Sequence, residues 1–225
     1  MFQVGKDWNP KQARLREIIL KPDNFDEAVQ LCLELHSIAH CSDISPDRSE
    51  TFFDEIWEGL TQEAFAAMPT HKDVTIAWNI WHITRIEDIT SNILIQEAEQ
   101  VLNDEWLKKL NVTVKDVGNS MTDDEIMAFS SSVRMRELRN YRNAVGARTK
   151  NILGSLSQPD MKRKMSRESV ERILDEGGVT AHEDSIWLLD FWGRKNVAGI
   201  LLMPITRHQI MHLGDSMRLK KRVMK

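Results

Sequence analysis

Residues 73–100 place the strongest constraint on how this chain can fold. Apolar residues recur in this segment about every three to four positions, which is the period of an α-helix. At about 100° per residue, one face of that helix carries Thr75, Trp78, His82, Ile86, Ile89 and Ile93. The segment therefore predicts a long helix that turns this face towards a protein core.

The rest of the chain also favours helices over strands. Glycine and proline are sparse, with ten and six among 225 residues, and alternation of apolar and polar residues is almost absent. The sequence predicts an all-α protein, a four-helix bundle with crossover topology and extra short helices in two long connections. The expected long helices span about 25–41, 73–100, 133–156 and 196–222, with a further helical segment over about 50–67.

The two long connections are residues 101–131 and 157–195, with short helices expected at 104–110, after Thr122 and at 166–175. In the last helix, Pro204 either introduces a kink or marks a true start near Met203. Residues 1–24 are expected to form an irregular N-terminal arm, and residues 25–225 a single bundle domain.

Composition excludes several classes of partner. The formal net charge of −4 gives no general attraction to nucleic acid. No apolar run approaches the roughly 18–20 residues that cross a bilayer, and the first residues lack the apolar stretch of a secretory signal. Cys32 and Cys41 are the only cysteines, which implies no disulfide framework. We therefore expect a cytoplasmic protein with neither a nucleic-acid nor a membrane partner.

Three histidines form the principal candidate site. His208 and His212 are four residues apart, so they stack one turn apart on one helix face and can direct their nitrogens at one metal ion. His82 lies on the inward apolar face of another long helix. A core histidine satisfied by a hydrogen bond would explain His82 alone. Three imidazoles buried together are better explained by a divalent ion that binds them all as neutral rings.

The residues around these histidines resemble a known family. The sequence Trp-His-Ile-Thr-Arg-Ile-Glu-Asp at 81–88 resembles the second-helix motif of the DinB-like superfamily, which includes the YfiT-like proteins. The sequence Thr-Arg-His-Gln-Ile-Met-His-Leu at 206–213 resembles the motif of its last helix. The resemblance spans roughly residue 25 to the end and implies a four-helix bundle with a long crossover between its second and third helices.

The resemblance also implies a metal cofactor, commonly zinc or nickel, bound by one histidine of the second helix and two of the fourth. Matched by position, these are His82, His208 and His212. Some relatives use such a site to activate a low-molecular-weight thiol, which implies a metal-dependent thiol S-transferase or hydrolase with a small-molecule substrate. The alternatives are a non-catalytic stress-response or ligand-binding bundle with a structural metal, and a metal-free scaffold. A homodimer is expected, because bundles of this size often pair through an apolar face.

Other residues are candidates for a supporting role around the metal. Asp215 shares the His208 face and would either orient a ligand imidazole or cap a neighbouring helix. Arg85, and less favourably Arg207, would bind an anionic substrate, and Trp78 would line the pocket or anchor the core.

Two further sets of residues leave alternatives open. His36 and His40 repeat the four-residue spacing and would be a second metal pair, pocket-lining groups or satisfied core residues. Glu87 and Asp88 fall away from the His82 face, so they are expected either in solvent or paired with other helices.

Overall fold

The computed structural model describes residues 2–45 and 48–224. Within these residues the secondary structure is helical with no strand, which confirms the all-α prediction. Four long helical segments run through the molecule: α2 (Phe25–Ala39), α5 (Ile76–Asp88) with a π-helical extension (Ile89–Ile95), α8 (Met135–Ser155), and α11 (Val197–Leu202) continued by α12 (His208–Val223).

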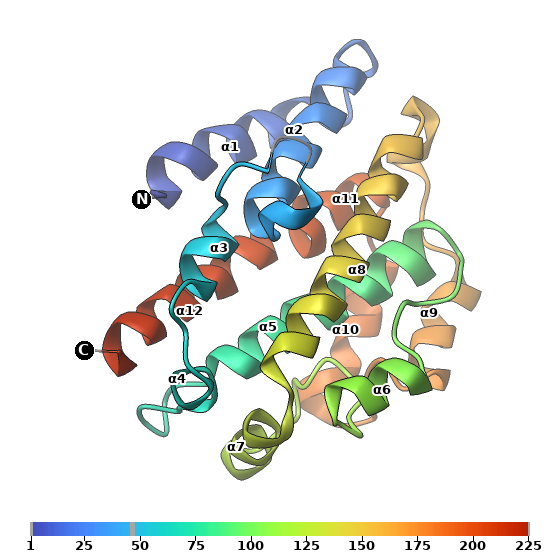
Figure 1. The fold of residues 1–225 in the computed structure, drawn as a ribbon. Coiled ribbons are helices and arrows are strands. Elements are labelled where there is room, and N and C mark those ends of the chain that lie inside the picture. The colour runs from blue at the N-terminus through green and yellow to red at the C-terminus, as the bar shows by residue number, and fades with distance from the viewer. Residues whose placement is uncertain (1, 46–47, 225) are drawn as a thin grey trace.

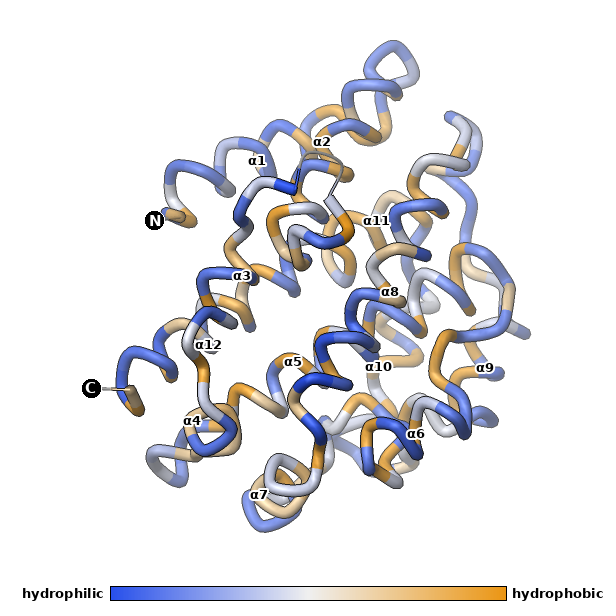
Figure 2. Tube along the Cα trace, in the orientation of Figure 1, coloured by the Kyte–Doolittle hydropathy of each residue, from blue (hydrophilic) through white to orange (hydrophobic). Residues whose placement is uncertain are grey.

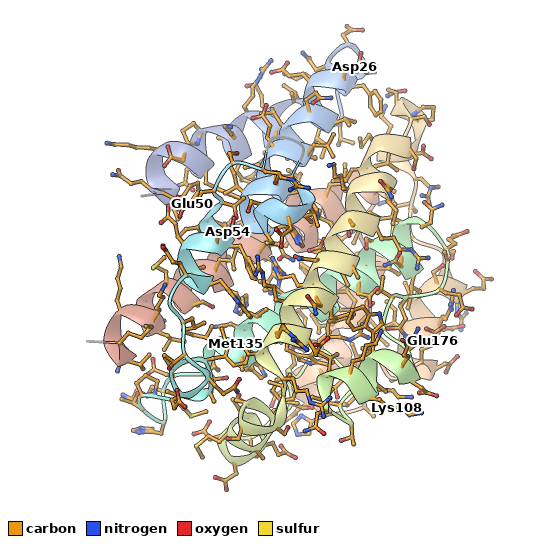
Figure 3. All side chains as sticks on the ribbon, in the orientation of Figure 1. Asp26, Glu50, Asp54, Lys108, Met135 and Glu176 are labelled. Atoms are coloured by element: carbon orange, nitrogen blue, oxygen red, sulfur yellow. The ribbon has the colours of Figure 1, made fainter. Side chains whose placement is uncertain are left out.

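These four segments pack around a shared interior (Figure 1). Helix α5 contacts both α8 and α12, and α2 contacts α8 and the turn between α11 and α12. The chain between α5 and α8 carries α6 (Asp104–Leu110) and α7 (Asp123–Ser132), and the chain between α8 and α11 carries α9 (Arg167–Asp175). These short helices agree with the sequence expectation, and side chains fill the space among the ribbons (Figure 3).

Helix α5 is buried along its whole length. The Thr75 hydroxyl caps its start by accepting a hydrogen bond from the backbone N–H of Trp78. Apolar residues on several faces, among them Ile76, Ile80 and Ile83, have no exposed surface. A helix with apolar residues all round occupies the centre of a fold, and α5 holds that place here.

Pro204 interrupts the last long helix by widening one turn. Residues Met203–Arg207 form a π-helical turn between α11 and α12, and Pro204 is buried within it. Proline has no N–H to donate and its ring collides with the preceding turn, so a regular α-helix cannot continue through it. Of the two alternatives from the sequence, the structure thus shows a continuous but distorted helix.

The N-terminal segment differs from the irregular arm that the sequence suggested. Residues Asn9–Ile18 form helix α1, which packs against α2. Pro10 occupies the first turn, where its missing N–H is not needed. Trp8, Leu15 and Ile18 are buried, so this segment contributes apolar side chains to the core and is ordered by that burial.

The helix expected at 50–67 is broken in two. Helix α3 (Phe52–Trp57) starts with a capping box between Thr51 and Asp54, and α4 (Gln62–Ala66) follows after a turn. Gly59 lies in that turn with φ of +65°, a conformation that glycine adopts without steric cost. The apolar periodicity of the sequence continues across Gly59, so it predicted one helix where the structure has two.

Besides α1, a second helix was missed by the sequence prediction. Helix α10 (Glu183–Gly193) lies in the second long connection, where the sequence predicted only α9. The His182 imidazole caps it by accepting from the backbone N–H of Asp184. Along the described helices, apolar and polar positions intermix (Figure 2), and none of these helices has the length and apolarity to cross a membrane.

Helix α8 approaches α2 closely at Gly146. A Cβ added at Gly146 would lie 2.4 Å from His40 Nδ1 and 2.7 Å from Ile44 Cδ1. We expect Gly146→Ala to lower the free energy of unfolding by about 1–3 kcal/mol, because overpacking outweighs the gain in helix propensity. Chemical denaturation would measure this change.

The matched control is Gly154→Ala in the same helix, where an added Cβ meets nothing within 4 Å. This variant should be neutral or more stable by up to about 1 kcal/mol. Equal effects of the two substitutions would contradict the close approach of α8 and α2.

Candidate metal centre

Helices α5 and α12 bring His82, which is buried, together with His208 and His212, which are half-buried. The ring centroids of His82 and His208 are 5.0 Å apart, those of His82 and His212 4.8 Å, and those of His208 and His212 4.6 Å. One nitrogen from each ring can be chosen so that all three lie within 4.8 Å of one another. The sequence expected this convergence of residues 126 positions apart, and the structure shows it.

The tautomer of His82 is fixed by a backbone carbonyl. His82 Nδ1 lies 2.7 Å from the carbonyl oxygen of Val117. A carbonyl oxygen only accepts, so Nδ1 carries the proton and Nε2 holds a lone pair. That Nε2 faces His208 Nε2 at 3.3 Å.

The tautomer of His212 is fixed in the same way by a side chain. His212 Nδ1 donates to the Oδ1 of Asn79, 2.7 Å away, which leaves Nε2 unprotonated. Asn79 is fully buried on α5, one turn before His82. The Nδ1 of His208 is buried and has no hydrogen-bond partner among the described residues.

Burial keeps the three imidazoles neutral. Burial lowers the pKa of His82 to about 3, with repulsion from His212 adding to the effect. Burial also lowers the pKa of His208 well below its usual range and lowers that of His212. Three neutral rings, two of them with Nε2 lone pairs fixed towards the cluster, form a donor set that fits a divalent cation.

Aromatic residues hold the His82 ring and the loop beside it. Trp78 stacks on His82 with ring centroids 4.6 Å apart and planes 9° from parallel. Its indole N–H donates to the carbonyl of Gly118, and that of Trp81 donates to the carbonyl of Asp116. Gly118 has a φ of +79°, and a Cβ there would lie 2.8 Å from the Trp78 indole nitrogen. These contacts hold the Val117 carbonyl against His82.

Of the two roles considered for Asp215, a hydrogen bond that orients an imidazole is not seen among the described residues, although its charge raises the pKa of His212 against the effect of burial. Its carboxylate accepts from Arg218, and its side chain is 48% exposed. The acceptors for the two imidazoles are Asn79 and the Val117 carbonyl instead. Asp215 is one helical turn beyond Met211 on α12, on the half-exposed side of that helix.

Arg85 is fully buried and engaged in an ion-pair network. Its guanidinium donates to Asp88, Tyr141 and Gln100 and to the carbonyl of Lys115. With these partners it has no free face for an anionic substrate. Arg207 is exposed at the start of α12.

Glu87 and Asp88 are buried and paired, so the alternative of solvent exposure is wrong. Glu87 accepts from His36 of α2 and from His40, which directly follows α2. Asp88 accepts from Arg85, Tyr141 and two backbone N–H groups. His36 and His40 thus form a separate cluster with Glu87, away from the triad.

Sequence reasoning missed the groups that set the tautomers. Asn79 precedes His82 by three residues, so its position one turn away on the same helix was available from the sequence. The Val117 carbonyl lies in a connection, and the approach of that backbone to α5 depends on tertiary packing. No periodic pattern reports such a contact.

Comparison with known proteins places the fold in a family. The model of the DinB superfamily matches residues 47–216, which is most of the chain. The chain belongs to the DinB superfamily. The matched residues contain His82, His208 and His212, whereas His36 and His40 precede them.

A solved structure supports the same architecture. It is the crystal structure of a conserved protein from Enterococcus faecalis, with a TM-score of 0.59 and 17% sequence identity. The match covers 87% of this chain and 96% of that one, and it concerns the fold alone. No curated protein matches this chain.

Proposed function

We propose that this DinB superfamily protein binds a divalent metal ion through His82, His208 and His212 and uses it to act on a small-molecule substrate. The convergence of the three imidazoles, with two tautomers fixed by Val117 and Asn79, carries the proposal. Zinc and nickel are the proposed ions, because imidazole nitrogens suit both. A closed structural zinc site normally has four protein ligands, and the triad supplies three.

We propose that the reaction is thiol transfer or hydrolysis. A divalent ion with open coordination positions supplies Lewis acidity, which lowers the pKa of a coordinated water or thiol. His82 and His212 keep their Nε2 lone pairs directed at the site, and Trp78 covers one face of the His82 ring. Trp78, stacked on His82, gives the site one aromatic wall, and a low-molecular-weight thiol is the substrate we propose.

Metal content tests the binding part of this proposal. Elemental analysis of purified protein should show that His208→Ala contains about one ion per chain less than the unmodified protein, because the remaining two imidazoles bind weakly. His71→Ala is the matched control, since His71 is exposed and outside the cluster. Equal metal content in His208→Ala and the unmodified protein would contradict the triad site.

Asn79 should tune metal affinity through His212. Asn79→Ala removes the acceptor for His212 Nδ1, and we expect roughly 10–100-fold weaker zinc binding in competition with a chromophoric chelator. Asp215→Ala removes a carboxylate that hydrogen-bonds Arg218 and acts on His212 only through its charge. Its zinc affinity should fall by less than that of Asn79→Ala; a larger loss in Asp215→Ala would reverse the assignment.

Activity requires a separate measurement. Zinc- and nickel-loaded protein should conjugate small thiols to electrophiles or hydrolyse activated esters, and chelation or His208→Ala should abolish the turnover. Restoration by added metal in the unmodified protein alone would tie turnover to the triad. Metal-loaded protein without any such activity would instead support a non-catalytic bundle braced by its metal.

A further inference from the structure

A second cluster of metal-ligating side chains lies between α2 and α5. His36 and His40 stack with ring centroids 4.1 Å apart. His36 Nε2 lies 2.9 Å from Glu87 Oε1, and His40 Nε2 lies 2.9 Å from Glu87 Oε2. The three side chains are at most 2% exposed.

We propose that His36, His40 and Glu87 form a second divalent-metal site, distinct from the histidine triad. Two imidazoles and one carboxylate are a donor set that first-row ions such as Fe²⁺, Mn²⁺, Co²⁺ and Zn²⁺ accept, and it leaves coordination positions open. The inference goes beyond the proposed function, because it concerns other residues and holds whether or not the triad binds metal.

The distances within the cluster suit a shared ion. Adjacent ligands around an octahedral ion with bonds of about 2.1 Å lie about 3 Å apart. The two nitrogen–oxygen separations of 2.9 Å are close to this value. With an ion bound, each imidazole would carry its proton on Nδ1 in place of Nε2, so both rings stay neutral and no proton is lost.

One polar atom of the cluster is unsatisfied. His40 Nδ1 is buried without a hydrogen-bond partner among the described residues. It lies against Gly146, where any side chain would collide with the ring. The atom has no partner in either tautomer of the ring, so the donor set and its distances, and not this atom, favour an ion.

The charges around the cluster indicate what else the ion would bind. The buried Arg142 interacts electrostatically with Glu87, and its guanidinium donates to the Ala39 carbonyl and to Gln209. Glu87 thus has a buried cationic neighbour in addition to the two imidazoles. A divalent ion adds positive charge to a buried site, which favours an anion in its open positions.

A cavity borders α2 beside the cluster. It has a volume of about 400 Å³ and its lining includes His36, Ser37, Glu34, Lys11 and Lys150. Lys11 pairs with Glu34, whereas Lys150 donates to the carbonyl of Ile44. Of the three cluster residues, the cavity lining includes His36, whose side chain is 2% exposed.

Co²⁺ titration of chelator-stripped protein tests the inference. The full-length His208→Ala/His212→Ala variant, which lacks two triad ligands, should still bind about one Co²⁺ per chain with a visible d–d absorption. Glu87→Gln added to this variant should abolish the absorption, and so should His36→Gln. Glu34→Gln is the matched control, because Glu34 is a half-exposed carboxylate on α2 that pairs with Lys11.

The outcomes separate the two sites. If the His208→Ala/His212→Ala variant binds no Co²⁺ while its circular dichroism is unchanged, the second site is overturned. The proposal that the triad binds metal would be unaffected. Persistence of the absorption in a folded Glu87→Gln or His36→Gln variant would overturn it as well. With the triad present, loss of a bound ion on Glu87→Gln but not on His208→Ala would support this site and contradict the triad.

Discussion

The polar side chains of α5 lie in the centre of the molecule, and their need for hydrogen-bond partners governs the rest of the structure. This helix has no exposed face, yet it carries His82, Arg85, Glu87 and Asp88. A buried charge without a partner costs several kcal/mol. Each neighbouring segment therefore supplies partners. The end of α2 supplies two imidazoles, and α8 supplies Tyr141 and Arg142. The connection between α5 and α8 supplies backbone carbonyl and N–H groups.

The candidate metal centre follows from the same requirement. His82 needs an acceptor for Nδ1 and finds the Val117 carbonyl, which α5 holds in place through Trp78 and Trp81. His212 finds Asn79. Satisfying one nitrogen of each ring leaves the other without a proton, and those nitrogens point into a shared space. The hydrogen bonds that make burial tolerable also prepare the rings to bind a cation.

Much of this arrangement could be predicted from the sequence. Apolar periodicity located the four long helices, and the four-residue spacing of His208 and His212 located their shared face. The same periodicity ran through Gly59 without showing the break, and it placed Glu87 and Asp88 away from the core because it assumed one buried face. A helix buried on all sides has no outer face, and only the packing of its neighbours reveals that.

The wide turn at Pro204 sets the direction in which the last helix presents its ligands. An extra residue in one turn rotates everything after it by about 100° relative to a regular helix. Helix α12 begins at His208, directly after this turn, and His212 follows one regular turn later. Both imidazoles are therefore rotated about the helix axis by the same angle. The turn at Pro204 thus sets the angle about the helix axis between the side chains of α11 that contact the core and the histidines of α12. A chain with a regular helix here could keep the same histidines and spacing, yet direct both rings past His82.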